Sequence, residues 1–194
     1  MKEQDICNYL DLKLDEFLGK FEEPLRSKLK HKLYFAGGCI YCLANDKPVK
    51  DYDLFMFDLE LLEELKQCDV FIYVSEYALS VGKFQIIYKH YGEPSECVSE
   101  FDFMHNMHYY IPTTKKICSG YDDECKYLHT TELIFNEERA RDIEGVLLRI
   151  KKFVKRGFSI SKETKKKIKS RTTRKSVKQY KKSRCSGGNR KCDS

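Results

Sequence analysis

The chain has 194 residues, 41% of them apolar and 13% aromatic, which is enough apolar surface for a folded core and excludes a chain that is disordered throughout. Its net charge of +6 is unevenly distributed: residues 161–194 are rich in Lys and Arg and contain only Glu163 and Asp193 as acids, so the rest of the chain is acidic. No segment offers the roughly 20 consecutive apolar residues of a membrane helix, and the first residues lack the apolar core of a signal peptide. We therefore expect a soluble, cytoplasmic protein with no membrane partner.

The first third of the chain predicts two helices, a buried strand and a tight turn. Apolar residues recur at helical spacing over residues 6–32, where Pro24 separates two helices. Residues 33–36 are a short apolar run that predicts a strand ending at Gly37-Gly38. Residues 39–44 then predict a short helix, and residues 52–57 predict a second strand.

The remaining elements alternate between strands and helices. Residues 59–67 have a helical leucine pattern, and three strands are expected over residues 70–75, 77–81 and 84–88, the first two as a hairpin. A short helix begins at Pro94, residues 101–104 and 108–111 are expected to be extended, and the longest helix is expected over residues 137–156, ending at Gly157. This order of elements indicates an α+β or α/β fold.

Asp51 and Asp53 stand at the start of the second predicted strand. Residues two apart in a strand point to the same side, so these two carboxylates are expected to lie close together. Carboxylates this close repel each other unless protons or cations bridge them. Two Mg²⁺ ions roughly 4 Å apart are the arrangement that phosphoryl transfer uses. The pair therefore predicts a site for two Mg²⁺ ions.

Gly37 and Gly38 supply the second half of the predicted site. A strand that turns into a helix through two residues without Cβ lets phosphate groups lie against the backbone N–H groups of the helix start. Alone, a Gly-Gly pair is usually a turn and an Asp-x-Asp pair is usually a solvated loop. Their order and spacing, each beside an apolar strand, together indicate a site for a nucleoside triphosphate.

The chain resembles the polymerase-β nucleotidyltransferase superfamily in two motifs, FAGG at residues 35–38 and DYDLF at residues 51–55. The likeness is to the compact nucleotidyltransferases of phages and prophages, and it spans about residues 33–160. The run LLRIKKF at residues 147–153 is similar to the helix after the catalytic head of tRNA CCA-adding enzymes, whose basic residues face the nucleotide.

This resemblance implies an α+β fold with a mixed, mainly antiparallel sheet flanked by helices. It divides the chain into N-terminal helices (1–32), a nucleotidyltransferase domain (33–135), a helix packed on that domain (136–160) and a basic, disordered tail (161–194). If a phage encodes the protein, the host cytoplasm is its expected location.

The superfamily places a third carboxylate on a neighbouring strand, where it helps to deprotonate the attacking hydroxyl. Gln85 stands where such an acid is expected, and glutamine cannot act as a base. Asp102, between two aromatic residues, is the best substitute, with Glu76 and Glu100 as alternatives. The structural interpretation of Asp102 is a helix cap or a turn.

Two further features concern the nucleotide. Where the tRNA enzymes carry Arg-Asp after their Gly-Gly, this chain has Tyr41-Cys42, so their discrimination between CTP and ATP is not carried over. Arg149 and Lys152 are three residues apart, hence on one helix face, and are predicted to contact the triphosphate. For the neighbouring Lys151, interaction with the helix dipole is the favoured interpretation.

These residues predict metal-assisted transfer of a nucleoside monophosphate from a triphosphate to a hydroxyl, with release of pyrophosphate. Asp51 and Asp53 would coordinate Mg²⁺, Asp102 would complete the site or accept the proton, and Gly37 and Gly38 would approach the β- and γ-phosphates. The acceptor is expected on RNA or DNA, bound through the basic tail; a merely solubilising tail is the alternative. Two other functions stay open: a catalytically degenerate nucleic-acid-binding protein of this fold, and a nucleotidyltransferase that modifies a protein hydroxyl.

The nine cysteines are odd in number and irregularly spaced, which indicates free thiols in a reducing compartment. Cys118 and Cys125 could form a zinc site with nearby histidines, but the spacing matches no common zinc pattern. Buried or incidental thiols are the favoured interpretation. The histidines in question are His105, His108 and His129.

Overall fold

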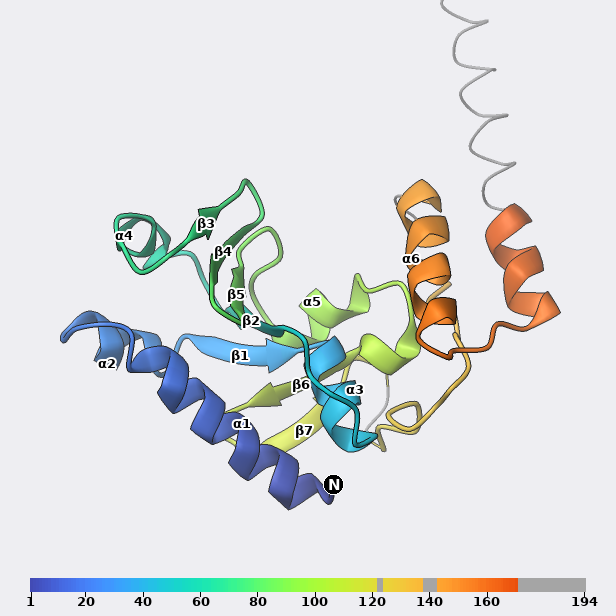
Figure 1. Cartoon of the computed structure of the whole chain (residues 1–194), viewed down its shortest axis with the longest axis horizontal. Coiled ribbons are helices and arrows are strands. Elements are labelled where there is room, and N and C mark those ends of the chain that lie inside the picture. Colours follow the sequence, from blue (N-terminus) through green and yellow to red (C-terminus); the bar gives the residue numbers. More distant parts are fainter. Residues whose placement is uncertain (122–123, 138–142, 171–194) are drawn as a thin grey trace, which may run out of the picture. The chain divides into compact units, whose positions relative to one another are not determined.

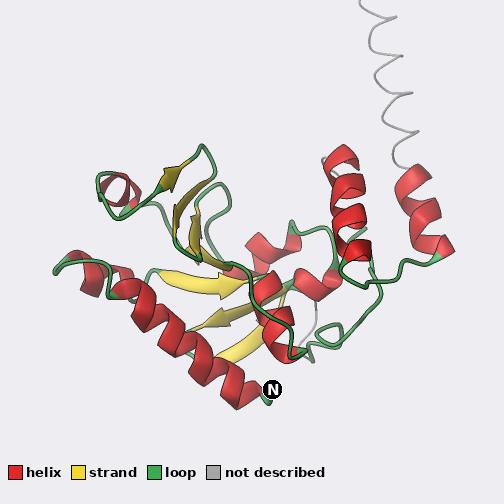
Figure 2. Ribbon diagram, viewed as in Figure 1, coloured by secondary structure: helices red, strands yellow, loops and turns green. Residues whose placement is uncertain are grey.

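The computed structural model describes residues 1–121, 124–137 and 143–170. The described chain divides into two compact units, the first within residues 1–130 and 136–137, the second within residues 131–135 and 143–170. The first unit is a sheet with helices, and the second contains the helix α6 (Ile143–Lys155) (Figures 1 and 2). The α+β architecture predicted from the sequence is confirmed. None of the described helices combines the length and the apolarity of a membrane span.

Seven strands form one open, mixed sheet in the first unit: β1 (Leu33–Ala36), β2 (Tyr52–Met56), β3 (Tyr73–Val74), β4 (Ala78–Val81), β5 (Phe84–Ile87), β6 (His108–Ile111) and β7 (Lys116–Ser119). Their order across the sheet is β3-β4-β5-β2-β1-β6-β7. The β2–β5 pair is parallel and the other five pairs are antiparallel. This arrangement puts β1 and β2, which carry the two predicted motifs, next to each other near the middle of the sheet.

The helices of the first unit are α1 (Glu3–Leu18), α2 (Leu25–Leu29), α3 (Gly38–Ala44), α4 (Leu62–Lys66), α5 (Pro94–Ser99) and the 3₁₀ turn η1 (Met104–Asn106). α1 runs along one face of the sheet (Figure 1). Leu10, Leu14 and Phe17 recur at helical spacing and are buried there, and the Phe17 ring lies 5.4 Å from that of Phe84. The predicted break at Pro24 is confirmed, because α1 ends before it and α2 begins after it.

Two hydroxyl contacts fix α1 on this face. The hydroxyls of Tyr9 and Tyr52 are hydrogen-bonded at 3.0 Å. The hydroxyl of Tyr110, in β6, donates to the carboxylate of Asp11 at 2.7 Å, and Lys115 forms an ion pair with the same carboxylate. Tyr52 belongs to β2, so α1 is bonded to the strand that carries the predicted acidic pair.

The opposite face of the sheet has a second core. Side chains alternate between faces along a strand, so Tyr34 and Phe55 point to this side, where their rings stack with centroids 5.7 Å apart. Val98 of α5 is buried in the same cluster, and the ring of Phe101 lies 5.8 Å from that of Phe55. The chain after α5 therefore packs on the face that also carries Asp53.

Several predicted elements are wrong in extent or type. Residues 101–104, expected to be extended, are extended only at Phe103: Phe101 and Asp102 lie in a bend, and Met104 begins η1. The Asn136 side chain donates to the carbonyls of Ser99, at 2.5 Å, and Phe101, at 3.0 Å, and these bonds hold the bend. The strand expected over residues 70–75 is reduced to the two residues of β3, the helix expected over 59–67 to the five of α4, and β7 was not predicted.

The second unit is built around α6. Residue 131 and residue 133 pair through their backbones with Ser159, at 2.9 Å in both cases, and the rings of Phe153 and Phe158 meet edge to face at 5.4 Å. Residues 162–170 are also helical. α6 ends before Gly157 as predicted, and 13 of its residues are described. Part of its predicted beginning lies outside the described residues. The tail beyond residue 170 lies outside them entirely.

Candidate functional site

The turn between β1 and α3 requires glycine at one of its two positions. Gly37 has φ +85°, and its N–H donates to the His108 carbonyl at 2.9 Å. A Cβ on Gly37 would lie 3.3 Å from Cε2 of Phe101, whereas a Cβ on Gly38 would meet nothing within 4 Å. Gly37 thus fixes the turn, while Gly38 leaves open space in front of the helix. The first N–H groups of α3 have no partner within the helix and can face that space.

Asp53 lies in β2 beside this turn. The register of β1 and β2 pairs Phe35 with Leu54, so Ala36, the last residue before the diglycine, is the next neighbour of Asp53. Asp53 and Asp51 are both half-buried, and Asp51 immediately precedes the strand. Leu54 belongs to the core under α1 and Phe55 to the opposite core, so the alternation of β2 that underlies the predicted acidic pair is present. That the two carboxylates together coordinate metal ions stays a prediction.

Cys39, in the first turn of α3, has a buried thiol near Asp53. Burial raises the pKa of the Cys39 thiol well above its ordinary value, and the negative charge of Asp53 raises it further. The thiol is almost completely buried and also faces the Ala36 carbonyl at 3.8 Å. The first turn of α3, which contains Cys39, therefore lies close to Asp53. Nothing in the sequence singled Cys39 out, because a thiol in an apolar helix looks like ordinary core.

The parallel strand β5 presents an amide to the acidic pair. Gln85 is the register partner of Asp53, and on the next strand Ser80 is the partner of Gln85. Among the described residues, no three Asp, Glu, His or Cys side chains gather in a group that could hold a metal ion. The donors predicted at this point are the carboxylates of Asp51 and Asp53, a type of ligand that suits a hard cation such as Mg²⁺.

Asp102 is buried in the bend between α5 and η1, with 5% of its surface exposed. Its carbonyl accepts a hydrogen bond from the Asn136 N–H at 2.8 Å. The preceding residue, Phe101, is the one that packs against Gly37 and Phe55. The backbone of Asp102 is therefore tied to the same loop that borders the diglycine turn. Its role as a third acid stays a prediction.

Tyr41 and Lys47 form a cluster on α3 and its following loop. The Tyr41 hydroxyl donates to the Thr130 carbonyl at 2.9 Å and accepts from Lys47 Nζ at 3.2 Å, and its ring meets that of His105 edge to face at 5.0 Å. The side chain of Asn45 bonds to the Leu128 carbonyl at 2.9 Å. Tyr41, at the position where the tRNA enzymes have Arg, is thus a buried residue that ties α3 to residues 128–130.

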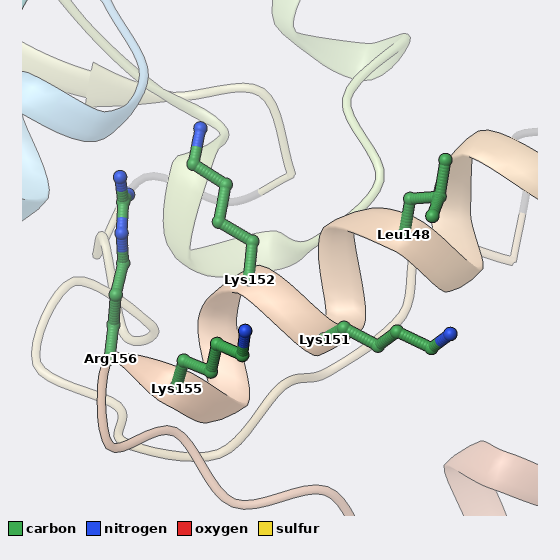
Figure 3. A pocket seen from close by; sticks show the side chains of 5 residues that line it. All are labelled: Leu148, Lys151, Lys152, Lys155 and Arg156. Atoms are coloured by element: carbon green, nitrogen blue, oxygen red, sulfur yellow. The ribbon is translucent and has the colours of Figure 1, made fainter.

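The basic residues predicted to contact the triphosphate belong to the second unit. Lys152 lines a surface hollow on α6 together with Leu148, Lys151, Lys155 and Arg156 (Figure 3). Arg149 is half-buried and does not line this hollow. The grouping of Lys152 with residues 155 and 156 was not predicted, since a helix surface offers both i+3 and i+4 neighbours.

The histidine and cysteine side chains considered for a zinc site have other contacts. His108 Nδ1 lies 3.1 Å from the His105 carbonyl, and its Nε2 lies 2.7 Å from the Tyr121 hydroxyl. The Cys125 thiol faces the Ile117 carbonyl at 3.9 Å. Both ring nitrogens of His108 are therefore engaged in hydrogen bonds of the core.

Solved structures of tRNA-processing enzymes share the fold. A CCA-adding enzyme in complex with CTP is 15% identical with a TM-score of 0.58, over 86% of this chain and 47% of that one. A tRNA-processing enzyme with CTP is 18% identical with a TM-score of 0.55, over 77% and 45%. The Thermotoga maritima CCA-adding enzyme complexed with tRNA is 16% identical with a TM-score of 0.55, over 81% and 44%. The chain thus spans less than half the length of each of these proteins.

Sequence comparison adds a family. No curated protein matches the chain significantly. The model of the Gabija anti-defense 2 family protein, Gad2, matches residues 8–143, which include both motifs and every strand of the sheet. The protein therefore belongs to the Gad2 family of Gabija anti-defense proteins, and its fold is that of the polymerase-β-type nucleotidyltransferases.

Proposed function

We propose that this protein is a Mg²⁺-dependent nucleotidyltransferase that moves a nucleoside monophosphate from a triphosphate to a hydroxyl on a nucleic acid. The activity would serve anti-defense in the host cytoplasm, in keeping with the family to which the chain belongs. One observation carries the proposal: Asp53 lies in the sheet next to Ala36, at the beginning of the Gly37-Gly38 turn into α3. A carboxylate for the cation and a helix start for the phosphates thus share one place.

The roles of the residues follow from that place. Asp51 and Asp53 would hold two Mg²⁺ ions, which, when bound, neutralise the charge of the triphosphate and stabilise the attacking and leaving oxygens. The open space at Gly38 and the N–H groups of the first turn of α3 would receive the β- and γ-phosphates. The acceptor oxygen bonds to the α-phosphorus as the bond to the β-phosphate oxygen breaks, pyrophosphate leaves, and Asp102 would take the proton of the acceptor hydroxyl.

The acceptor is proposed from the comparisons and from charge. Solved structures of this fold include complexes with CTP and with tRNA. Residues 161–194 carry a strong excess of Lys and Arg, which suits binding to a phosphodiester backbone. Arg149 and Lys152 remain the proposed triphosphate contacts of the second unit.

A second candidate function has its own observation. Gln85, which is neutral, is the register partner of Asp53 on β5, where a carboxylate would help to bind a cation or accept a proton. A member of the fold that binds nucleotide and nucleic acid without transfer would have such an amide. The retention of Asp51 and Asp53 favours the enzyme, because two neighbouring acids repel each other without a cation.

The test is transfer of radioactive label from each α-labelled nucleoside triphosphate to tRNA, to short RNA and DNA primers, and to proteins of a host lysate. Wild-type protein with Mg²⁺ is expected to label one nucleic-acid acceptor, and Asp51→Asn and Asp53→Asn to label none. Asp69→Asn, which removes an exposed acid outside the site, is the matched control and should keep wild-type labelling.

Three outcomes are informative against the proposal. Wild-type labelling by the Asp53→Asn protein would refute the assigned site. Labelling of a protein band alone would move the acceptor to a protein hydroxyl. Mg²⁺-dependent nucleotide binding in a thermal-shift titration, with no label transferred to any acceptor, would establish the non-catalytic candidate.

A further inference from the structure

We infer that the solvent-exposed face of α6, which includes the proposed triphosphate contact Lys152, is a binding surface for the phosphodiester backbone of a nucleic acid. The surface consists of Lys151, Lys152, Lys155 and Arg156, with Leu148 at its edge; we call it the α6 basic face. This inference adds a binding surface to the proposed function, and it rests on that proposed function for the identity of the nucleic-acid acceptor. The binding itself requires no transfer reaction.

The arrangement of the four cations follows from helix geometry. Residues 151 and 155 are four apart, as are residues 152 and 156, so the four cations form two adjacent rows on α6 and its end. Figure 3 shows Lys152 and Arg156 extending in the same direction, one turn apart. The other side of α6 is apolar: Val146 is buried and Phe153 packs on Phe158. The helix thus has a fixed inner side and presents its cations outward.

These cations are not neutralised by neighbouring acids. None of the four makes an ion pair with any residue that the structure describes, and all four are exposed. Lysines elsewhere differ: Lys28, Lys32 and Lys66 each pair with a glutamate, at 3.1, 2.9 and 2.7 Å. Four like charges held together on one helix face repel each other, and an anionic partner would relieve that repulsion.

The charge spacing suits a nucleic acid. Residues 151–156 span about 7.5 Å of helix at 1.5 Å per residue, which gives about one positive charge per 2 Å. Double-stranded DNA carries about one negative charge per 1.7 Å of its axis. The charge densities therefore match over a short stretch of backbone, whereas a single free phosphate would engage only part of the face.

The segment that follows α6 is also basic. Residues 162–170 are helical and carry five lysines, of which Lys167 is paired with Glu163 at 3.1 Å. A membrane helix of the interfacial type would need a broad exposed apolar side opposite its charges. On α6 the side opposite the cations is occupied by the unit itself, where Val146 is buried and Phe153 packs on Phe158. The exposed apolar residues of α6, which are Leu147, Leu148 and Val154 at 40%, 66% and 46%, lie beside the cations and not opposite them. Nucleic acid is therefore favoured over an anionic membrane.

The experiment measures binding of the full chain to fluorescein-labelled single-stranded RNA, single-stranded DNA and duplex RNA by anisotropy over a range of salt concentrations. The test variant carries Lys151→Gln, Lys152→Gln, Lys155→Gln and Arg156→Gln, which removes four charges while keeping good helix formers. The matched control removes four exposed lysine charges of the first unit: Lys2→Gln, Lys30→Gln, Lys89→Gln and Lys116→Gln.

Each phosphate contact contributes about −0.7 to the slope of log K against log salt for a single strand. If all four cations contact phosphates, the test variant should have a slope less steep by about 3 and should bind at least tenfold more weakly in low salt, whereas the control should keep the wild-type slope. The tail is present in both proteins, so its contribution cancels. Circular dichroism melting verifies that the variants fold, and the double variant Lys152→Gln/Arg156→Gln should show about half the change in slope.

Four results would overturn the inference. Two concern the salt slope: no change in the test variant, or an equal change in the control. The other two are wild-type binding by the double variant if the fourfold variant does not fold, and binding to phosphatidylserine vesicles with none to nucleic acid. Asp53→Asn separates this inference from the proposed function. That variant should lose transfer and keep the wild-type salt slope. If the wild-type protein binds nucleic acid but transfers no nucleotide, the enzyme proposal is refuted and the binding role of the α6 basic face is still supported.

Discussion

Gln85 lies directly opposite Asp53 in the parallel pair of β5 and β2. If the proposed site holds Mg²⁺, an amide at this position would offer the cation one neutral oxygen, whereas a carboxylate would add a full negative charge. The identity of residue 85 should therefore set how strongly the site attracts Mg²⁺ and how stable it is without the ion.

Gln85→Glu is expected to increase the stabilisation by Mg²⁺. Without the ion, the facing carboxylates should lower the free energy of unfolding by about 0.2–1 kcal/mol, because like charges opposite each other in a sheet repel. With the ion, the melting temperature should rise more than it does in wild type. Differential scanning fluorimetry with and without Mg²⁺ measures both effects. In an Asp53→Asn background the extra response should shrink, and an equal response in both backgrounds would contradict the pairing.

The two glycines should respond differently to alanine. Gly37→Ala forces a Cβ into a conformation with φ +85° and toward the Phe101 ring, so it should cost about 1–3 kcal/mol in urea unfolding. Gly38→Ala should keep wild-type stability and weaken nucleotide binding, since its methyl group would enter the space proposed for phosphate. Calorimetric titration with nucleotide measures the second effect. Wild-type nucleotide affinity in folded Gly38→Ala protein would argue against a phosphate at this turn.

Tyr121→Phe should destabilise the first unit. The Tyr121 hydroxyl lies 2.7 Å from Nε2 of His108 and accepts from the Tyr127 N–H at 3.1 Å, so its removal withdraws both bonds from a half-buried region. A loss of about 1–3 kcal/mol in the free energy of unfolding is expected. Tyr34→Phe is the control: that hydroxyl is buried, and its partner is the Cys97 thiol, a weak hydrogen-bonding group, with no nitrogen or oxygen partner in the described part of the chain. Equal losses in the two variants would show that the network adds nothing.

The buried His105 should make the protein less stable in mild acid. Burial, followed by the charges of His108 and Lys47, lowers the pKa of His105 from 6.5 to about 3. The folded value lies below the unfolded one, so the unfolded chain takes up the proton first, and this contribution to stability is lost as pH falls from about 6.5 toward 3. Between pH 7 and 5 the loss should be about 2 kcal/mol.

Urea unfolding of wild type and His105→Phe at the two pH values isolates this contribution. Phenylalanine keeps a ring against Tyr41 and Phe103 and removes the titrating group. The variant should therefore have the flatter pH dependence. Parallel pH dependences would show that His105 does not titrate as expected.

Local patterns made half of the candidate site predictable. β1, the diglycine turn, α3 and the acids at the start of β2 are each visible within a few residues, because an apolar run, a residue pair without Cβ and a two-residue alternation are local signals. The neighbourhood of Ala36 and Asp53 follows once β1 and β2 pair, and that pairing was implied by the resemblance alone.

Pairings between distant segments were not predictable. The register of Asp53 with Gln85 depends on the order of strands in the sheet, which no single segment encodes. Residues 101–104 look extended by composition, but the buried Asn136 bonds to the carbonyls of Ser99 and Phe101 and bends the chain. Residues 70–75 are apolar enough for a strand, yet Ile72 is 83% exposed beside β3, which forms one edge of the described sheet and pairs with β4 on one side only.

The hydrogen bond between Tyr9 and Tyr52 links the N-terminal helix to the residue that separates Asp51 from Asp53. A substitution at position 9, more than forty residues earlier in the chain, would then change how β2 is positioned. In the evolution of this family the two tyrosines should consequently be lost or replaced together. A lineage that adapts its acidic strand would have to adapt its first helix as well.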